Sequence, residues 1–300
     1  MDMNETQALT ALTELWRPNI RFPNRRRFAT LGAGVAAGLG PLLEEAGYRW
    51  ANTEPAPRGL SVQNARQFNY DVFSCRTGAI TTAAVLHQWV AWALGHSTPP
   101  DMVWEFAGRS FDPFRPMIEP DGFATPAEVL STRALTLAAL KKALEAAGDL
   151  VIVLDGVESW QDKATKVEYP ACAEIFAKAY SPERHDTKSR PYPAVIKSLK
   201  ETIAMLQRAN KNIRILLGVN GPDFAAATYS KNPAILAACG GAAVLRAAMG
   251  QLAATQKGVT YLPVYEMALQ GIPHEIIQCA VVERLQQLAP VQGSDGPEQP

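Results

Sequence analysis

The sequence predicts an α/β fold with three layers, α/β/α, in which helices cover both faces of a parallel, flavodoxin-like sheet of about five strands. Leu150–Leu154 and Ile213–Val219 are near-continuous apolar runs, which are typical of strands buried on both faces. Long segments with helical periodicity alternate with these strands, at 125–147, 192–209 and 234–255. This alternation favours a parallel sheet over an antiparallel one.

The composition fits an ordinary globular chain of one or two domains. Of 300 residues, 47% are hydrophobic and 19% charged, and 29 basic residues balance 29 acidic ones. This neutral balance argues against a nucleic-acid partner. The longest apolar segments fall short of the roughly 18 unbroken residues of a membrane-spanning helix, so we expect no transmembrane segment.

The four cysteines are widely separated, with no C-x-x-C pair and no neighbouring histidine. We therefore expect reduced thiols in a cytoplasmic protein, with no metal site and no cofactor. The alternative is export, because Arg25-Arg26 followed by an alanine- and glycine-rich run resembles a twin-arginine signal. Against export, the run ends in Pro41–Glu45, without an A-x-A-like cleavage site.

The chain begins with a lead-in, residues 1–27, that contains a short helix at Glu5–Trp16. A strand at Phe28–Leu31 then enters a glycine turn, a helix follows at Val35–Ala46, and Tyr48–Trp50 is the next extended piece. Strand, glycine turn and helix form the usual ligand-binding corner of an α/β fold. We expect the site at this turn.

The middle of the chain mixes helices with long loops. A helix is predicted at Thr81–Leu94, where the helical spacing places His87 in the core. Pro99–Pro120 contains five prolines and reads as an irregular segment that covers a pocket. After the strand that ends at Leu154, 161–180 reads as loop with a short helix, and Ser181–Lys188 as a charged loop that exposes His185.

The last predicted strand is Val259–Val264, which brings the total to five. Five strands connected in this way favour one domain, 28–289, with inserted loops. The tail, 290–300, is rich in Gly, Pro, Asp and Glu and is expected to be disordered. The oligomeric state is not predicted.

The glycine turn supports a dinucleotide-binding interpretation. Gly32 and Gly34 follow a strand, and Glu54 lies 20 residues after Gly34, where an acid that binds ribose belongs. The third glycine, Gly38, comes one residue too late for G-x-G-x-x-G, which would displace the helix contact.

A second interpretation comes from resemblance to a known family. The stretches that carry it are, in order, Gly32–Ala36, Glu54–Pro57, Phe73–Thr82, Asp112–Pro116, Glu119–Phe123, Leu154–Trp160, Tyr169–Cys172 and Tyr261–Glu266. In this order and spacing, the chain from Trp16 to Glu266 resembles the GSCFA-domain family, relatives of the SGNH/GDSL hydrolases. The resemblance implies an SGNH-hydrolase-like fold and ester hydrolysis or acyl transfer on a carbohydrate-like substrate.

The differences from this family fall at its reactive positions. Ala33 stands where the resemblance places the serine nucleophile, and Ala79 where it places an asparagine that stabilises the oxyanion. Gly32 and Gly78 occupy the other oxyanion-type positions. His274 is the possible base, but Gly271 stands where the orienting aspartate belongs. We therefore expect a pseudoenzyme with a binding or structural role.

The remaining pocket candidates are Gly34, Cys75, Asp155, Glu158 and Asn220. Asp155 ends a buried strand, where such folds place active groups, although an aspartate there also caps the following turn. Residual esterase activity at a relocated site therefore stays an alternative. The expected ligand is a small or carbohydrate-like molecule.

Overall fold

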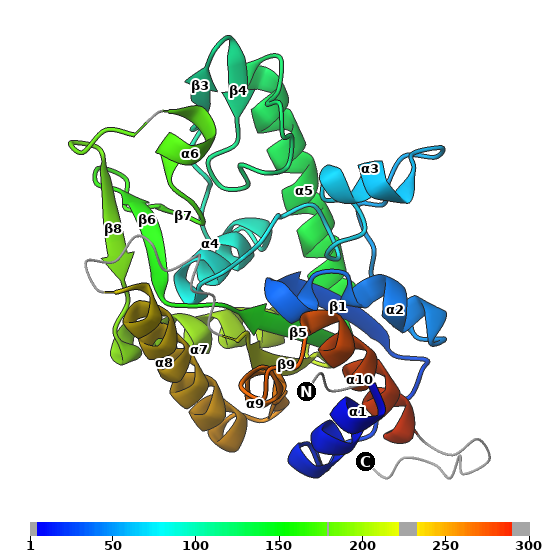
Figure 1. The fold of residues 1–300 in the computed structure, drawn as a ribbon. Helices are drawn as coiled ribbons and strands as arrows, with labels where there is room; N and C mark the ends of the chain where they lie inside the picture. Colours follow the sequence, from blue (N-terminus) through cyan, green and yellow to red (C-terminus); the bar gives the residue numbers. More distant parts are fainter. Residues whose placement is uncertain (1–4, 179, 222–232, 290–300) are drawn as a thin grey trace.

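The computed structural model describes residues 5–178, 180–221 and 233–289, so the predicted disordered tail lies outside the described residues. A five-stranded, all-parallel sheet forms the centre, in the order β10-β9-β5-β1-β2 (Figure 1). Its strands are β1 (Arg27–Gly32), β2 (Arg49–Trp50), β5 (Asp149–Leu154), β9 (Arg214–Val219) and β10 (Val259–Tyr261). The predicted three-layer α/β/α fold and its five strands are confirmed.

The side chains on the two faces of this sheet pack into two separate hydrophobic clusters. Leu150, Ile152 and Leu154 of β5 lie in one cluster, and Val151 and Val153 lie in the other. Because successive side chains of a strand point to opposite faces, a strand covered on both sides is apolar at nearly every position. This is the physical reason for the uninterrupted apolar run.

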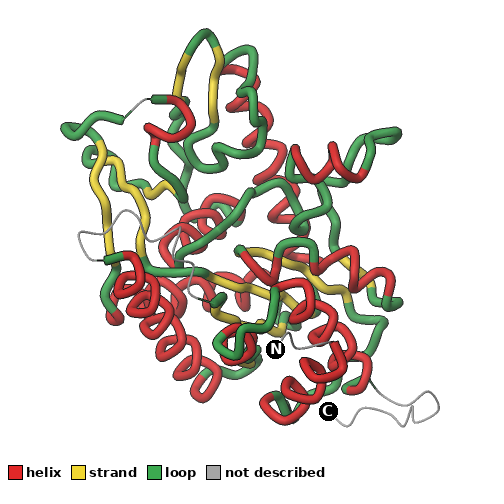
Figure 2. Tube along the Cα trace, viewed as in Figure 1, coloured by secondary structure: helices red, strands yellow, loops and turns green. Residues whose placement is uncertain are grey.

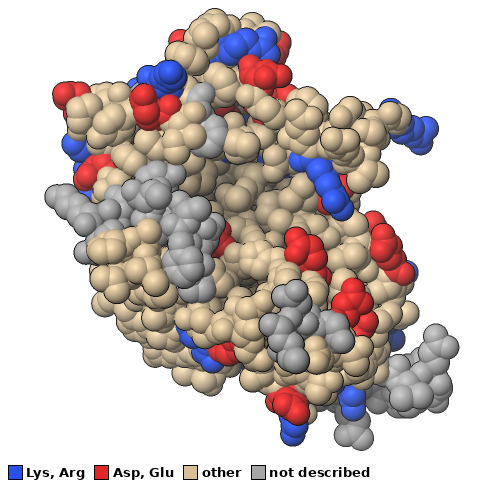
Figure 3. Space-filling model, viewed as in Figure 1, with Lys and Arg blue, Asp and Glu red and all other residues tan. Residues whose placement is uncertain are grey.

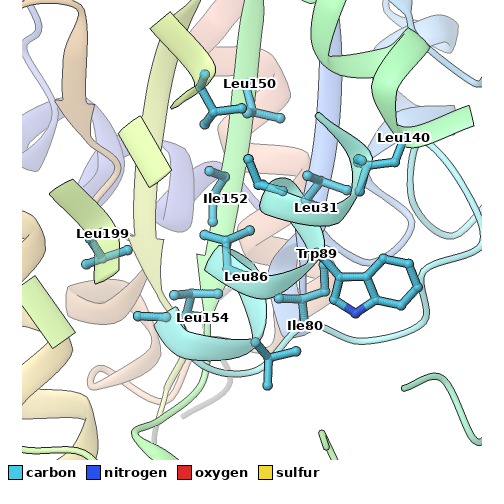
Figure 4. Packing of buried hydrophobic residues seen from close by; sticks show 14 of the residues in the cluster. Leu31, Ile80, Leu86, Trp89, Leu140, Leu150, Ile152, Leu154 and Leu199 are labelled. Atoms are coloured by element: carbon cyan, nitrogen blue, oxygen red, sulfur yellow. The ribbon is translucent and has the colours of Figure 1, made fainter. Parts of the chain in front are cut away.

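Four long helices contribute to the cluster on the first face: α4 (Ala83–Ala93), α5 (Pro126–Ala146), α7 (Tyr192–Ala209) and α8 (Ala234–Thr255). Leu86 and Trp89 of α4 approach Leu31, Ile152 and Leu154 of the sheet (Figure 4). Thr82 caps α4 by accepting a hydrogen bond from the N–H of Val85. The cap fixes the point at which the chain leaves the sheet edge and enters the helix.

The opposite face is covered by α1 (Glu5–Leu15), α2 (Leu39–Glu45), α9 (Val264–Ala268) and α10 (His274–Gln287). The single helix predicted from Val35 to Ala46 is wrong, because a 3-10 turn at Gly34–Ala36 precedes α2. Gly38 separates the two with a φ of 81°, a conformation that glycine adopts without strain. Helices α1 and α10 lie side by side (Figure 1).

Two small sheets lie outside the central one and were not expected from the sequence (Figure 2). They are the hairpin of β3 (Trp104–Phe106) and β4 (Arg109–Phe111), and a sheet of β6 (Glu158–Asp162), β7 (Glu168–Tyr169) and β8 (His185–Ser189). Two short helices, α3 (Val62–Gln67) and α6 (Ala173–Ala177), complete the described elements. The predictions of loop at 161–180 and 181–188 are therefore wrong in part.

The expectations for two histidines are also wrong. His185 is only 3% exposed, since β8 pairs with β6, and its Nδ1 accepts a hydrogen bond from the N–H of Ser181 at 3.1 Å. Burial and the neighbouring Arg184 charge lower the pKa of His185. His87 is half-buried rather than in the core, and its Nε2 lies 3.4 Å from a carboxylate oxygen of Glu201 on α7.

Helix α8 is the one described helix that is long and apolar enough to cross a membrane. Length and composition are weak indications, because the core helix of a soluble protein passes the same test. Leu245, Met249 and Leu252 of α8 are buried in the first hydrophobic cluster. The helix therefore contributes to the core beside the sheet.

A buried group of charges holds the segment that contains the β3–β4 hairpin. The carboxylate of Asp112, 1% exposed, accepts hydrogen bonds from Arg115 Nε at 2.7 Å and from Arg133 Nη2 at 2.9 Å. Arg133 also donates to the carbonyls of Pro100 and Met102. One carboxylate thus joins the irregular segment to α5.

The same group of charges continues to the loop before α4. Arg115 Nη1 donates to Thr136 Oγ1 at 2.6 Å and to the carbonyl of Arg76 at 3.2 Å. Thr136 Oγ1 donates to Glu54 Oε1 at 2.9 Å, and Glu54 Oε2 accepts from the N–H of Arg76 at 2.9 Å. Segments that begin at Glu54, Arg76 and Asp112 are therefore fixed relative to one another.

We expect Asp112→Asn to lower the free energy of unfolding by about 3 kcal/mol or more, because two buried guanidinium groups lose their counter-charge. Urea denaturation followed by circular dichroism measures this loss. The control is Asp186→Asn, which removes a solvent-exposed partner of Lys188 and should leave stability unchanged within error. Equal losses in the two variants would contradict the structural role of Asp112.

Candidate functional site

The carboxyl ends of β1, β5 and β9 lie next to one another and form the edge where the sequence predicts a site. After β1 the chain passes to β2 on one side of the sheet, and later to β5 on the other. Such a reversal of strand order leaves a crevice at the carboxyl ends. On the face shown in Figure 3, a hollow lies between the part that carries the β3–β4 hairpin and the part that carries the sheet.

The loop before α4 crosses this edge. The N–H of Ile80 donates to the carbonyl of Gly32 at 2.8 Å, which fixes the loop to the end of β1. The carbonyl of Thr81 accepts from the N–H groups of Asp155, at 2.9 Å, and Gly156, at 3.2 Å, beyond the end of β5. Residues 78 and 79, predicted as oxyanion-type positions, therefore lie beside the glycine turn, and Ala79 is exposed.

The glycine turn itself is tightly packed. Gly32 has a φ of 117°, and a Cβ there would lie 1.9 Å from the carbonyl oxygen of Val153. That same oxygen accepts the N–H of Ala33 at 2.9 Å. Because this N–H is already used within the sheet, it does not point freely at a ligand. Ala33 is 4% exposed and carries no polar side-chain atom.

Asn220 packs against the other side of the turn. Its N–H donates to the carbonyl of Leu154 at 2.8 Å, which extends the β5–β9 pairing by one residue. A Cβ at position 34 would lie only 2.0 Å from Nδ2 of Asn220, so the amide fills the space that a side chain at this position would need. Asn220 is 4% exposed, and its Oδ1 has no hydrogen-bond partner among the described residues.

A cavity of about 530 Å³ opens beside the turn. Its lining includes Gly34, Arg66, Asp71, His274, Glu275 and Cys279. The structure thus brings the predicted base, His274, into the same cavity as the turn after β1. Gln278 supports the arrangement, since its Nε2 donates to the carbonyls of Val35 at 2.9 Å and Ala37 at 2.5 Å.

The other predicted site residues have different surroundings. Cys75 is 1% exposed in the core, where burial and the Glu54 carboxylate raise the pKa of its thiol. Asp155 is half-buried directly after β5, and Glu158 is half-buried at the first position of β6. Of the predicted residues, Gly34, Ala79, Asp155 and Asn220 lie around the same strand ends.

In the structure, Glu54 is not free to bind a ribose, as the dinucleotide interpretation requires. Both carboxylate oxygens of Glu54 already accept hydrogen bonds, from Thr136 Oγ1 and from the N–H of Arg76. Gly38 precedes α2 as its N-terminal cap instead of packing the helix against a strand. The alternative built on Gly32, Gly34 and Glu54 is therefore not supported by this geometry.

Sequence reasoning did not foresee two features of the site. One is Gln278, which fixes the turn although it lies 243 residues after Val35 and 241 residues after Ala37 in the chain. The other is the contact between Asn220 and Gly34. The glycine at position 34 was the one sign in the sequence that another group packs closely there. Within the part of the chain that the structure describes, no group of three or more His, Cys, Asp or Glu side chains is arranged to hold a metal ion.

A family model described as the GSCFA family matches residues 27–277, which is most of the chain. The chain belongs to the GSCFA family. The match begins at the first residue of β1 and ends in α10, so the GSCFA region includes the whole parallel sheet and His274. No curated protein sequence matches the chain.

The packing at the turn predicts unequal effects of two alanine substitutions. Gly38→Ala meets no atom within 4 Å and should cost only the strain of a positive φ, about 1–2 kcal/mol. Gly34→Ala meets the same strain and the Asn220 amide, so we expect a further loss of about 1–3 kcal/mol. Thermal unfolding measures both.

Adding Asn220→Ala to Gly34→Ala should recover part of this further loss, because the second change removes the atoms that collide. The same addition to Gly38→Ala serves as the control and should recover nothing. Additive losses in both double variants would show that Asn220 does not limit the space at position 34.

Proposed function

We propose that this GSCFA protein is an SGNH-hydrolase-like scaffold that binds a small acyl-bearing or carbohydrate-like ligand without cleaving it. The observation that carries the proposal is the turn after β1. It presents Ala33 and Gly34, neither of which has a side-chain oxygen or sulfur atom to attack an ester. The resemblance to the SGNH/GDSL hydrolases puts the nucleophile at Ala33.

Ester hydrolysis by such a scaffold needs a nucleophile, a base and donors for the developing oxyanion. The N–H of Ala33, which sits at the nucleophile position, already donates to Val153. The asparagine position is Ala79, which has no amide to donate. Loss of a nucleophile alone removes several orders of magnitude of rate, and loss of an oxyanion donor removes more.

Two of the described thiols, Cys279 and Cys75, are candidate replacements, and neither is suited to attack. Cys279 lines the same cavity as His274, but burial and the carboxylates of Glu5 and Glu283 raise the pKa of its thiol. The core thiol of Cys75 has a raised pKa as well. A thiol held in its protonated form is a poor nucleophile.

Binding is still well supported by the same surroundings. The cavity beside Gly34 offers charged and polar side chains from Arg66, Asp71, His274 and Glu275. A few polar groups in a cavity of some hundreds of Å³ are typical of small-molecule sites.

The residues that resemble an export signal are part of the folded domain. Arg26 pairs with the buried carboxylate of Asp149 at 3.0 Å, and the next residue, Arg27, begins β1. Cleavage after the apolar run would remove β1, which lies between β5 and β2. We therefore propose that the chain keeps these residues and acts in the cytoplasm.

An assay with p-nitrophenyl acetate tests the proposal. The purified protein should hydrolyse the ester no faster than the same solution after heat denaturation. Ala33→Ser combined with Ala79→Asn restores the missing hydroxyl and amide, and we expect it to raise the rate at least about tenfold. Ala79→Asn alone is the matched control and should stay inactive, because it supplies no nucleophile.

Ligand binding without turnover is measured in parallel by thermal unfolding with cello-oligosaccharides and their O-acetylated forms. A bound sugar should raise the melting temperature, and Leu42→Trp, which fills the cavity, should abolish the rise. Rapid hydrolysis by the unchanged protein, lost in His274→Gln, would instead establish an esterase with a relocated site. No rise with any sugar would argue against this ligand class.

A further inference from the structure

A second cleft, of about 370 Å³, lies at the other end of α10 from the candidate site. Three arginines line it: Arg17 and Arg21 from the segment between α1 and β1, and Arg284 from the last turn of α10. His274, which lines the first cavity, precedes Arg284 by ten residues, or roughly 15 Å along the helix. The two cavities have no lining residue in common.

The position of Arg284 is fixed before any ligand arrives. Its Nε and Nη2 donate to the carbonyl of Trp16 at 3.2 and 2.9 Å, and its Nη1 donates to Gln287 Oε1 at 2.9 Å. None of these acceptors carries a charge. The guanidinium group is therefore held in place while its positive charge stays uncompensated by them.

Carboxylates do not neutralise these arginines in the described part of the chain. Arg17, Arg21 and Arg284 take part in none of the ion pairs formed there. The nearby buried carboxylate of Asp149 is already shared by Arg26, at 3.0 Å, and Arg214, at 2.6 Å. Burial and the Arg17 charge lower the pKa of Arg284, as expected for cations that repel one another.

A further pair of arginines lies on the adjacent strands β1 and β2. Arg27 of β1 and Arg49 of β2 are register partners and both are exposed. Like charges directly opposite each other on adjacent strands destabilise a sheet. Five of the residues from 17 to 27 are arginines, and none is an acid.

We propose that the Arg17–Arg21–Arg284 cleft binds the phosphate group of a small phosphate ester or of a lipid headgroup. Guanidinium groups bind phosphate oxygens through paired N–H donors and keep their charge at any physiological pH. Asn19 adds an amide, and Pro18, Ile20 and Leu288 supply an apolar wall for the organic part of the ligand. Bound phosphate joins the lead-in to α10 and thereby stabilises the contact between them.

Calorimetric titration with sodium pyrophosphate at low ionic strength tests the site on the full chain. Arg17→Gln with Arg21→Gln should weaken binding at least about tenfold, since two charge-assisted contacts are lost. Neither side chain forms an ion pair in the described structure, so this variant should fold normally. Arg58→Gln with Lys257→Gln removes two exposed charges elsewhere and should bind as the unchanged protein does.

A second arm uses sedimentation with phosphatidylglycerol vesicles and identifies the source of the phosphate. Vesicle binding that is lost in the Arg17/Arg21 variant, without pyrophosphate binding, would support the site with a lipid headgroup as its ligand. Binding of neither probe, or equal binding by both double variants, would overturn the proposal. Neither result bears on the proposed ester-like ligand, because that ligand binds in the other cavity.

Discussion

The ion pairs of the buried Asp112 carboxylate are the interaction on which the part of the molecule around the β3–β4 hairpin and α5 depends. The carboxylate pairs with Arg115 and Arg133 inside the protein, where an unpaired charge costs several kcal/mol. Through Arg115 and Thr136 the same bonds reach Glu54 and the loop before α4. Stretches that resemble GSCFA motifs therefore meet in one group, although they are far apart in the sequence. This group holds the loop that crosses the carboxyl edge of the sheet.

The contacts that hold the carboxyl edge of the sheet do not involve the side chain at position 33. The charged group fixes the loop, Gln278 fixes the turn, and Asn220 occupies the space beside Gly34. None of these contacts needs a hydroxyl at Ala33. The sheet edge is thus held by the side chains of residues other than Ala33. Position 34 is more constrained than position 33, because its lack of a side chain is what lets Asn220 approach.

The sequence predicted what depends on local periodicity and missed what depends on long-range pairing. Apolar runs identified β5 and β9, since strands buried on both faces are apolar along most of their length. Strand β8 was missed because His185–Ser189 is short and polar, and it becomes a strand only by pairing with β6. For the same reason His185 was expected at the surface. At the site, the glycine turn and His274 could be located from the sequence. The hydrogen bonds that occupy Glu54 could not, because their donors lie on α5 and in the loop at Arg76. The spacing between Gly34 and Glu54 does not indicate these bonds.

The net charge of the chain does not reveal where its charges gather in the folded protein. A net charge of zero argued against a nucleic-acid partner, yet it averages over an uneven distribution of charge. Residues 17–27 contain five arginines and no acid. Two of these arginines, Arg17 and Arg21, line the same cleft as Arg284, whose own hydrogen bonds go to neutral acceptors. Electrostatic attraction at a cleft depends on the charges within about one Debye length, roughly 8–10 Å, and not on the total. A neutral chain can therefore present a strongly cationic cleft, and only the folded arrangement reveals it.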